Sequence, residues 1–367
     1  MNGTVWRRLR THFDWPLLLT TLAIAAVGLV NLYSATRHAP QKGLFGVQIW
    51  WMVIGLAAFV AMSALDYRLW VRFAWIALAV GLIAVVLVHF GGIARKGSRR
   101  WLGVGALSLQ PSEFIKLAVI LALARFVHDR GTEERSLKEL APRVAAFVGA
   151  IVLIAWQPDL GTAMLVALIC ASVAFLSARK LWPLLVALKV AAAAVPVLWV
   201  TNVLHDYQKR RILTFLDPSA DPSGAGWHAR QSIFAVGSGK IVGKGFMHGT
   251  QNQLNFLPEQ WTDFPFSVWA EEWGFVGSVA LLGLYVFLIV WTINVASQAR
   301  DRFGATLCLG VAAMIFWHVV VNIAMVTGLA PVVGVTLPLV SYGGSSVLTV
   351  FLGLGLVASV SARRWAH

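Results

Sequence analysis

The sequence predicts an all-α polytopic membrane protein with about ten transmembrane helices. Of its 367 residues, 58% are hydrophobic and 13% are charged, and the mean hydropathy is +0.74. A soluble globular domain has about 25% charged residues. Apolar segments long enough to approach the thickness of a bilayer recur along the whole chain. These observations exclude an ordinary soluble protein and favour a helical bundle in a membrane.

A spanning helix needs roughly 20 apolar residues. The first segment follows Arg7, Arg8 and Arg10, as in a signal peptide, but it lacks a convincing small-residue cleavage site. We therefore expect it to be retained as the first helix. The predicted spans are 16–36, 46–64, 70–90, 112–128, 143–157, 160–178, 181–201, 266–297, 303–327 and 338–361.

The lysine and arginine residues between these spans predict the orientation. Alternate connections are basic, and the positive-inside rule places them, with both termini, in the cytoplasm. The opposite face of the plasma membrane then receives a large extracytoplasmic loop, 202–265, between helices 7 and 8. This loop is too short for a domain with its own core, so we expect a single transmembrane domain over 1–367. Within the loop, 226–236 reads as an amphipathic helix that could bury Trp227, Ile233 and Phe234 and lie in the membrane interface.

The net charge of +14 includes basic residues that this topology places outside, against the rule. Arg99 and Arg100 lie in the loop 91–111, and Arg210 and Arg211 lie in 202–265. Attraction to anionic lipid is one interpretation, and a phosphate-bearing ligand on the outer face is the other. We favour the ligand, because carboxylates converge on the same side. The basic residues are scattered between apolar segments, which argues against a nucleic-acid partner.

Carboxylates and cysteines are both scarce. The stretch LPEQWTDFPF, 257–266, places Asp263 at the rim of a predicted span. A carboxylate there is a functional-site hypothesis, and the alternative is an N-cap for the helix that follows. Glu271, eight residues further, is close to two helical turns away and is expected on the same face. Cys170 and Cys308 lie inside apolar runs, which predicts core residues with no disulfide and no metal site.

Two further motifs place charges at outer helix ends. In QPSEFIK, Glu113 suits a first helical turn, and Lys116 lies one turn further on the same face. Lys116 could form an internal pair with Glu113 or face a cavity. In QPDLGT, Asp159 could cap the next helix or pair with Lys116 and hold it in place.

The motif LPLVSYGGSS, 337–346, brings Ser341, Gly343 and Gly344 near the start of the last span. An opened turn with free backbone N–H groups would bind an anion. Close helix packing through small residues is the alternative. Taken together, the motifs predict one outer cavity with acids, cations and glycine-rich backbone. A lipid-linked phosphorylated substrate fits this mixture.

These motifs resemble those of the SEDS (shape, elongation, division, sporulation) family of cell-wall glycosyltransferases, over essentially the whole chain. The HGTQNQLNFLPE stretch, 248–259, is most similar to the RodA branch, whereas Gly343–Ser346 is closer to the FtsW branch. Trp261 stands where the family often has histidine, Pro265 where it usually has an aliphatic residue, and Trp273 where leucine is common. The motifs that carry the resemblance are Arg99–Trp101, Gln110–Lys116, Gln157–Thr162, Gly245–Phe266, Ala270–Gly274 and Leu337–Gly344.

The resemblance implies a peptidoglycan glycosyltransferase that polymerises lipid II into β-1,4 glycan strands outside the plasma membrane, during cell elongation and shape maintenance. It also implies a class B penicillin-binding protein as partner. Asp263 would be the general base, and Lys116, Arg99 and Arg100, with Arg210 or Arg211, would stabilise the undecaprenyl diphosphate leaving group. The sequence contains no dedicated metal-ligand cluster, and a divalent cation (Mg or Mn) held partly by Asp263 stays open.

Three alternatives remain at this point. A division-type paralogue would have the same chemistry. A lipid II flippase would move the substrate without joining it, but its site should lie near the membrane midplane, whereas the acids here lie on the outer side. A scaffold that only recruits the penicillin-binding protein would leave Lys116 and Asp159 unexplained.

Overall fold

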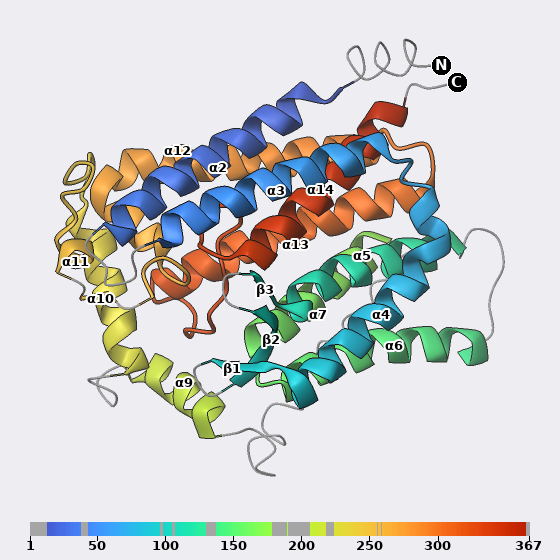
Figure 1. Cartoon of the computed structure of the whole chain (residues 1–367), viewed down its shortest axis with the longest axis horizontal. Coiled ribbons are helices and arrows are strands. Elements are labelled where there is room, and N and C mark those ends of the chain that lie inside the picture. Colours follow the sequence, from blue (N-terminus) through green and yellow to red (C-terminus); the bar gives the residue numbers. More distant parts are fainter. Residues whose placement is uncertain are drawn as a thin grey trace.

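Long helices dominate the computed structural model, which describes residues 13–37, 43–95, 98–104, 107–129, 137–177, 189, 206–217, 224–254, 256–257 and 259–364 (Figure 1). The helices at the predicted spans are α2 (Trp15–Thr36), α3 (Leu44–Ala64), α4 (Leu69–Gly91), α5 (Pro111–Asp129), α6 (Leu137–Trp156), α7 (Leu160–Ser177), α12 (Pro265–Ser297), α13 (Arg302–Val326) and α14 (Gly344–Arg363).

Nine of the ten predicted spans are helical in the described residues, and the predicted span 181–201 lies outside them apart from residue 189. Six of these helices, α2, α3, α4, α12, α13 and α14, are long and apolar enough to cross a membrane. Shorter apolar stretches occupy α6 and α7. The fold is thus that of a multi-pass membrane protein. The total of ten spans, their sidedness and the single domain over 1–367 stay predictions.

The helix α13 lies at the centre of the bundle. It packs against α5, α7, α12 and α14, while α14 packs along α3. The contact between α14 and α3 is close because Gly355 faces the backbone of α3, where an added Cβ would lie 2.7 Å from the Phe59 carbonyl oxygen. Both cysteines are free, and Cys308 is buried in α13.

The two ends of the bundle gather different connections. At one end, the Ser361 hydroxyl donates to Asp14 at 2.5 Å, and the Tyr67 hydroxyl donates to Asp301 at 2.7 Å. This end therefore holds the start of α2, the end of α14 and two connections predicted to be cytoplasmic. At the other end lie α9 (Asp206–Leu216), α10 (Ala225–Ser238) and α11 (Thr250–Gln253) (Figure 1). The separation agrees with the predicted alternation of loops.

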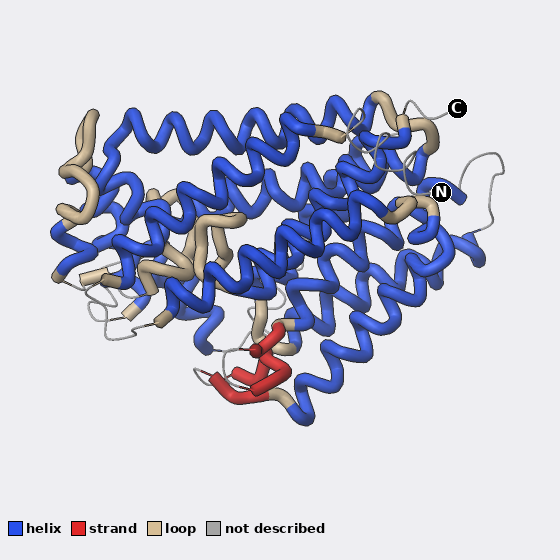
Figure 2. The backbone as a smooth tube through the Cα atoms, turned by 45° about the horizontal axis from the view of Figure 1, so that its top comes forward, coloured by secondary structure: helices blue, strands red, loops and turns tan. Residues whose placement is uncertain are grey.

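The prediction of an all-α fold was wrong for the connection 91–111. Its described residues form a three-stranded antiparallel sheet of β1 (Ile93–Arg95), β2 (Ser98–Val104) and β3 (Leu107–Leu109), in that order. In Figure 2 the strands lie together at the lower edge of the molecule, beside the end of a helix. Aromatic and branched residues in Ser98–Val104 favour strand structure, but strands this short leave little periodicity in the sequence.

The helix α12 is broken at Gly274, whose φ and ψ are 65° and −160°. The segment 239–245 fills the break: the backbone N–H groups of Lys244 and Gly245 donate to the carbonyls of Glu271 and Glu272, at 3.0 Å each. Beyond the break, Phe275 N–H donates to the Lys240 carbonyl at 2.9 Å. The segment 239–245 is thereby fixed to the first part of α12.

The predicted loop helix is present as α10. Its buried face carries Ser232 and Ala235, and the Ser232 hydroxyl donates to the Val326 carbonyl at 2.7 Å. Trp227, Ile233 and Phe234, which the sequence offered for burial, are exposed. They are not part of the protein core, and their burial in the membrane interface stays a prediction.

Candidate active site

A cavity of about 420 Å³ opens where the sheet, the start of α14 and the turn before α12 meet. Its size lies within the usual range for a ligand site. Its lining is rich in charged and polar groups. The acidic, basic and histidine residues that line it are Arg100, Glu113, Asp159, Arg211, Glu259, Asp263 and His318.

Asp263 lies in a tight turn just before α12. The Glu259 carbonyl accepts the backbone N–H groups of Thr262 and Asp263, at 3.1 and 3.0 Å. The helix begins at Pro265 with Phe264 as its N-cap, and no side chain caps it. Asp263 is therefore not the helix cap that was its alternative role, and its half-buried side chain lines the cavity.

Arg100 and Arg211 are the arginines that line the cavity among the described residues. Arg100, in β2, lies 3.7 Å from Asp159 and donates to the Pro158 carbonyl. Arg210 is exposed on α9 and does not line the cavity, so the structure favours Arg211 between the two. Arg99 belongs to β2, and its side chain lies outside the described part.

Asp159 caps α7, because its Oδ1 accepts the Thr162 N–H at 3.4 Å. Its Oδ2 accepts the Ser112 hydroxyl and the Gln110 amide, at 3.0 Å each. The suggestion that Asp159 pairs with Lys116 was wrong. Its carboxylate is already bonded at the first turn of α5, while Lys116 lies one turn further along that helix.

Lys116 has two partners in the interior. Its Nζ lies 2.8 Å from Glu113 Oε1 and 2.8 Å from Nε2 of His318, in α13. The residue is only 1% exposed and does not line the cavity, although Glu113 and His318 do. The internal pair is confirmed, whereas the alternative of a cation facing the cavity was wrong. His318 was missed, and its only sequence signal was a histidine inside an apolar helix.

The glycine-rich turn lies outside the last helix, which begins at Gly344 rather than near 338. Gly343 and Gly344 line the cavity, and the first N–H groups of α14 have no intrahelical partner. Ser341 does not line it: its hydroxyl accepts the Leu337 N–H at 2.7 Å, and its carbonyl accepts the Gln48 amide at 3.2 Å.

Glu271 was expected beside Asp263, and this was wrong. Asp263 precedes the first residue of α12, so helical spacing does not relate the two residues. Glu271 is fully buried and pairs with Lys244 at 2.6 Å, with the Thr250 hydroxyl donating to it at 3.1 Å. It belongs to the contact between α12 and the residues 244–251, and it does not line the cavity.

The carboxylates that face the cavity could help to bind a divalent cation. Glu113, Asp159, Glu259 and Asp263 line the same cavity, and carboxylate oxygens are ligands for Mg²⁺ and Mn²⁺. Within the described residues, no group of three histidine, cysteine or acidic side chains is arranged as a metal site. A Mg or Mn ion held partly by Asp263 stays a prediction.

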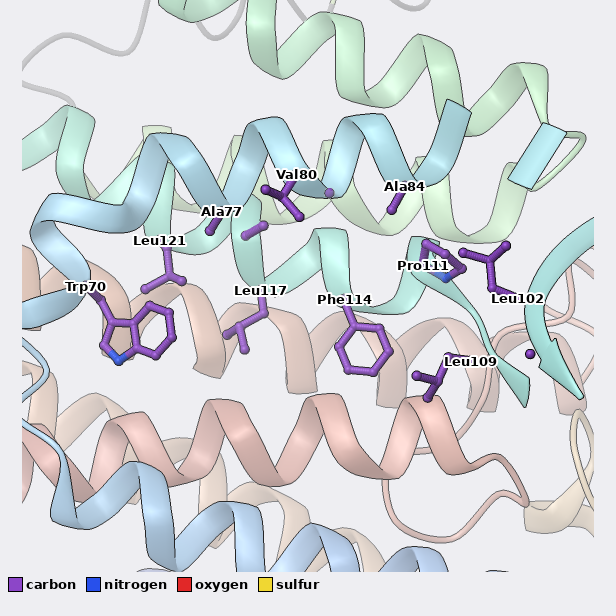
Figure 3. Close-up of a pocket in the computed structure, with 13 residues that line it drawn as sticks. Trp70, Ala77, Val80, Ala84, Leu102, Leu109, Pro111, Phe114, Leu117 and Leu121 are labelled. Carbon is purple, nitrogen blue, oxygen red and sulfur yellow. The ribbon is translucent and has the colours of Figure 1, made fainter. Parts of the chain in front are cut away.

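A second, apolar cavity of about 520 Å³ lies between α4, α5 and the strands (Figure 3). Trp70, Leu121, Leu117 and Phe114 follow one another along it toward Leu109. Pro111 lines this apolar groove, while Gln110 and Glu113 line the charged cavity. The start of α5 therefore lies between the apolar groove and the charged cavity.

Known proteins are similar to this chain over nearly its whole length. Peptidoglycan glycosyltransferase MrdB of Escherichia coli K12 is 41% identical over 362 residues, which cover 98% of this chain and 96% of that protein. Peptidoglycan glycosyltransferase RodA of Treponema pallidum is 32% identical over 427 residues, covering 96% and 98%.

Solved structures of related proteins are also similar to this chain. One chain of a peptidoglycan synthase complex, described for its coordination of polymerization and crosslinking, matches with a TM-score of 0.82 and 34% identity. The match covers 97% of this chain and 99% of that one. The rod shape determining protein RodA of Thermus thermophilus matches with a TM-score of 0.72 and 31% identity, covering 97% and 98%. The cell cycle protein family that comprises FtsW, RodA and SpoVE matches residues 14–365, and this chain belongs to that family.

Proposed function

We propose that this protein is a peptidoglycan glycosyltransferase that polymerises lipid II on the outer face of the plasma membrane, in cell elongation. The observation that supports this most directly is that Asp263, Arg100 and Arg211 line one cavity. A carboxylate and two guanidinium groups are what proton removal and diphosphate departure require. The relatives named peptidoglycan glycosyltransferase are 41% and 32% identical to this chain over nearly its whole length.

In the proposed reaction, Asp263 takes the proton from the 4-hydroxyl of the acceptor sugar. That oxygen forms a bond to the anomeric carbon of the donor, on the face opposite the leaving group. The bond from this carbon to the diphosphate oxygen breaks, and undecaprenyl diphosphate leaves with the electron pair. Inversion gives the β-1,4 link. A general base contributes about 10²- to 10⁴-fold in typical cases.

The diphosphate would be met by Arg100 and Arg211, with Arg99 as a further candidate. Lys116 is too deeply buried to touch it, so we propose that Lys116 orients Glu113 and His318, which do line the cavity. The apolar groove of Figure 3 offers a path for the polyprenyl chain, because its lining is almost entirely hydrocarbon. A lipid-linked substrate would thus lie across both cavities.

A class B penicillin-binding protein is the proposed partner. The support is the similarity to a chain of a peptidoglycan synthase complex in which polymerization and crosslinking are coordinated. We expect that partner to raise the rate of glycan synthesis by this chain.

A gel assay for glycan polymer tests the proposal. Purified protein is incubated with lipid II, with and without the partner, and with Mg²⁺, Mn²⁺ or EDTA. The wild-type protein should form polymer, and Asp263→Asn should form none while retaining the wild-type melting temperature. Polymer formation by Asp263→Asn at the wild-type rate would overturn the role of Asp263. Transport of labelled lipid II across vesicles by the wild-type protein, without polymer, would identify a flippase instead.

A further inference from the structure

Two polar side chains on one face of α13 bind the same piece of backbone. His318 Nδ1 lies 2.9 Å from the Thr336 carbonyl, and Asn322 Nδ2 donates to the Val335 carbonyl at 2.7 Å. The two residues are four apart, so they project from one side of the helix. Both are buried within the bundle, where a polar group is costly unless it is hydrogen-bonded. They therefore hold the segment 333–336 against α13.

Each of these side chains also reaches a second group. His318 Nε2 lies 2.8 Å from Lys116 Nζ, and Asn322 Nδ2 donates to the backbone carbonyl of Asp263 at 3.0 Å. A carbonyl only accepts and an ammonium only donates, so the His318 proton belongs on Nδ1 and its Nε2 accepts from Lys116. A flipped Asn322 amide would set its oxygen against two acceptors, which fixes its orientation as well.

The segment 333–336 is the wall of the cavity beside Asp263. Gly334 lies next to the carboxylate, since an added Cβ would be 3.4 Å from Asp263 Oδ2. The Thr336 hydroxyl lies 3.0 Å from the Ser346 hydroxyl at the start of α14. This wall has no helical or strand hydrogen bonding of its own. Its position depends on the side chains that hold it, and α13 supplies two of them.

We propose that His318 and Asn322 are positioning residues, which fix the segment 333–336 and thereby hold the Asp263 turn and the Lys116–Glu113 pair in one arrangement. The inference rests on the proposed glycosyltransferase function. Neither residue takes part in bond formation. Their loss lets the cavity wall and the base move relative to each other, and a misplacement of about 1 Å costs on the order of 100-fold in rate.

The test compares kcat and KM for lipid II among purified variants. Asn322→Leu keeps the approximate shape but removes both N–H donors, and its kcat should fall about 100-fold at unchanged KM. In His318→Asn, the amide nitrogen takes the position of Nδ1 and can still donate to the Thr336 carbonyl. In His318→Gln, the amide group takes the position of Nε2, so it faces Lys116 and does not reach Thr336. Because the bond to Thr336 holds the wall, His318→Asn should retain more kcat than His318→Gln.

Ser172→Ala is the matched control. It removes another hydrogen bond of α13, the 2.8 Å bond from Trp317 Nε1 to the Ser172 hydroxyl in α7, and its kcat should equal that of the wild type. If Asn322→Leu does not fold, the two His318 variants decide the question. Wild-type kcat in the variants, a change in KM instead of kcat, or an equal loss in Ser172→Ala would overturn the inference. Absence of polymer from the wild-type protein would overturn the proposed function itself.

Discussion

The Arg100 guanidinium lies 3.7 Å from the Asp159 carboxylate, with the arginine side chain 27% exposed. This pair joins β2 to the start of α7 and directs a cation into the cavity. Asp159 is thus a support for Arg100 rather than for Lys116. Because the pair is partly open to solvent, its own contribution to stability should be below about 1 kcal/mol, and its importance lies in where it holds Arg100.

Arg100→Ala and Asp159→Asn should therefore differ in size. Arg100→Ala removes the proposed charge-assisted contact to the diphosphate, worth about 1.5–3 kcal/mol, so KM for lipid II should rise about 10- to 100-fold. Asp159→Asn leaves the guanidinium in place and only loosens it, so KM should rise by about fivefold at most. Steady-state kinetics measure both, and a larger effect from Asp159→Asn would contradict this order.

The buried Lys116–Glu113 pair predicts a stability effect that a double variant reverses. Glu113→Gln leaves the Lys116 charge without its carboxylate in the interior, at a cost of about 3–5 kcal/mol. Adding Lys116→Met removes the isolated charge, so the double variant should regain most of that loss. Thermal unfolding of the purified protein in detergent measures the difference. A double variant less stable than Glu113→Gln alone would show that the pair is not the cause.

The spans could be predicted because a helix that crosses a bilayer needs about 20 apolar residues in succession. Such a run can be recognised from the local sequence alone. The grouping of Arg100, Asp159, Asp263 and Gly343 at one cavity followed from topology, since alternate connections meet at one end of the bundle. The strands were not predictable, because they form through pairing between short segments and not through an apolar period.

The failures share a physical cause, which is that side-chain direction depends on distant packing. His318 lies 202 positions from Lys116, and nothing local in either helix indicates the other. Glu271 was expected on the same face as Asp263 because of helical spacing, but α12 begins at Pro265, after Asp263. Arg210 and Arg211 are neighbours on a helix, where successive side chains point in different directions. Arg210 therefore points outward, whereas Arg211 lines the cavity.

The Lys244–Glu271 pair predicts that the segment 239–245 can be released from α12 by one substitution. Glu271 is fully buried, and Lys244 is the cation 2.6 Å from it. Lys244→Met leaves that carboxylate without its ion partner, so segment 239–245 should detach from the break at Gly274. Hydrogen exchange should then speed up at the backbone N–H groups of position 244, Gly245 and Phe275.

Lys240→Met is the control for that experiment, because Lys240 is an exposed neighbour whose loss changes the net charge equally. Its exchange pattern should match the wild type. Faster exchange at the same positions in both variants would attribute the effect to charge in general and not to the pair.

Gly334 should be required for catalysis beyond its backbone role, and Gly328 offers a test of that distinction. Both glycines have a φ of +76°, a conformation that costs an alanine about 1–2 kcal/mol. At Gly334 the new methyl group would lie 3.4 Å from Asp263 Oδ2, whereas at Gly328 it would meet the Ile233 side chain. Gly334→Ala and Gly328→Ala should therefore both lower the melting temperature. Only Gly334→Ala should also lower kcat, roughly 10- to 100-fold, because the methyl group displaces water and substrate from the carboxylate.

Melting curves and polymerisation rates on the two purified variants separate the effects. An equal loss of kcat in both would mean that backbone strain, and not the contact with Asp263, limits the reaction.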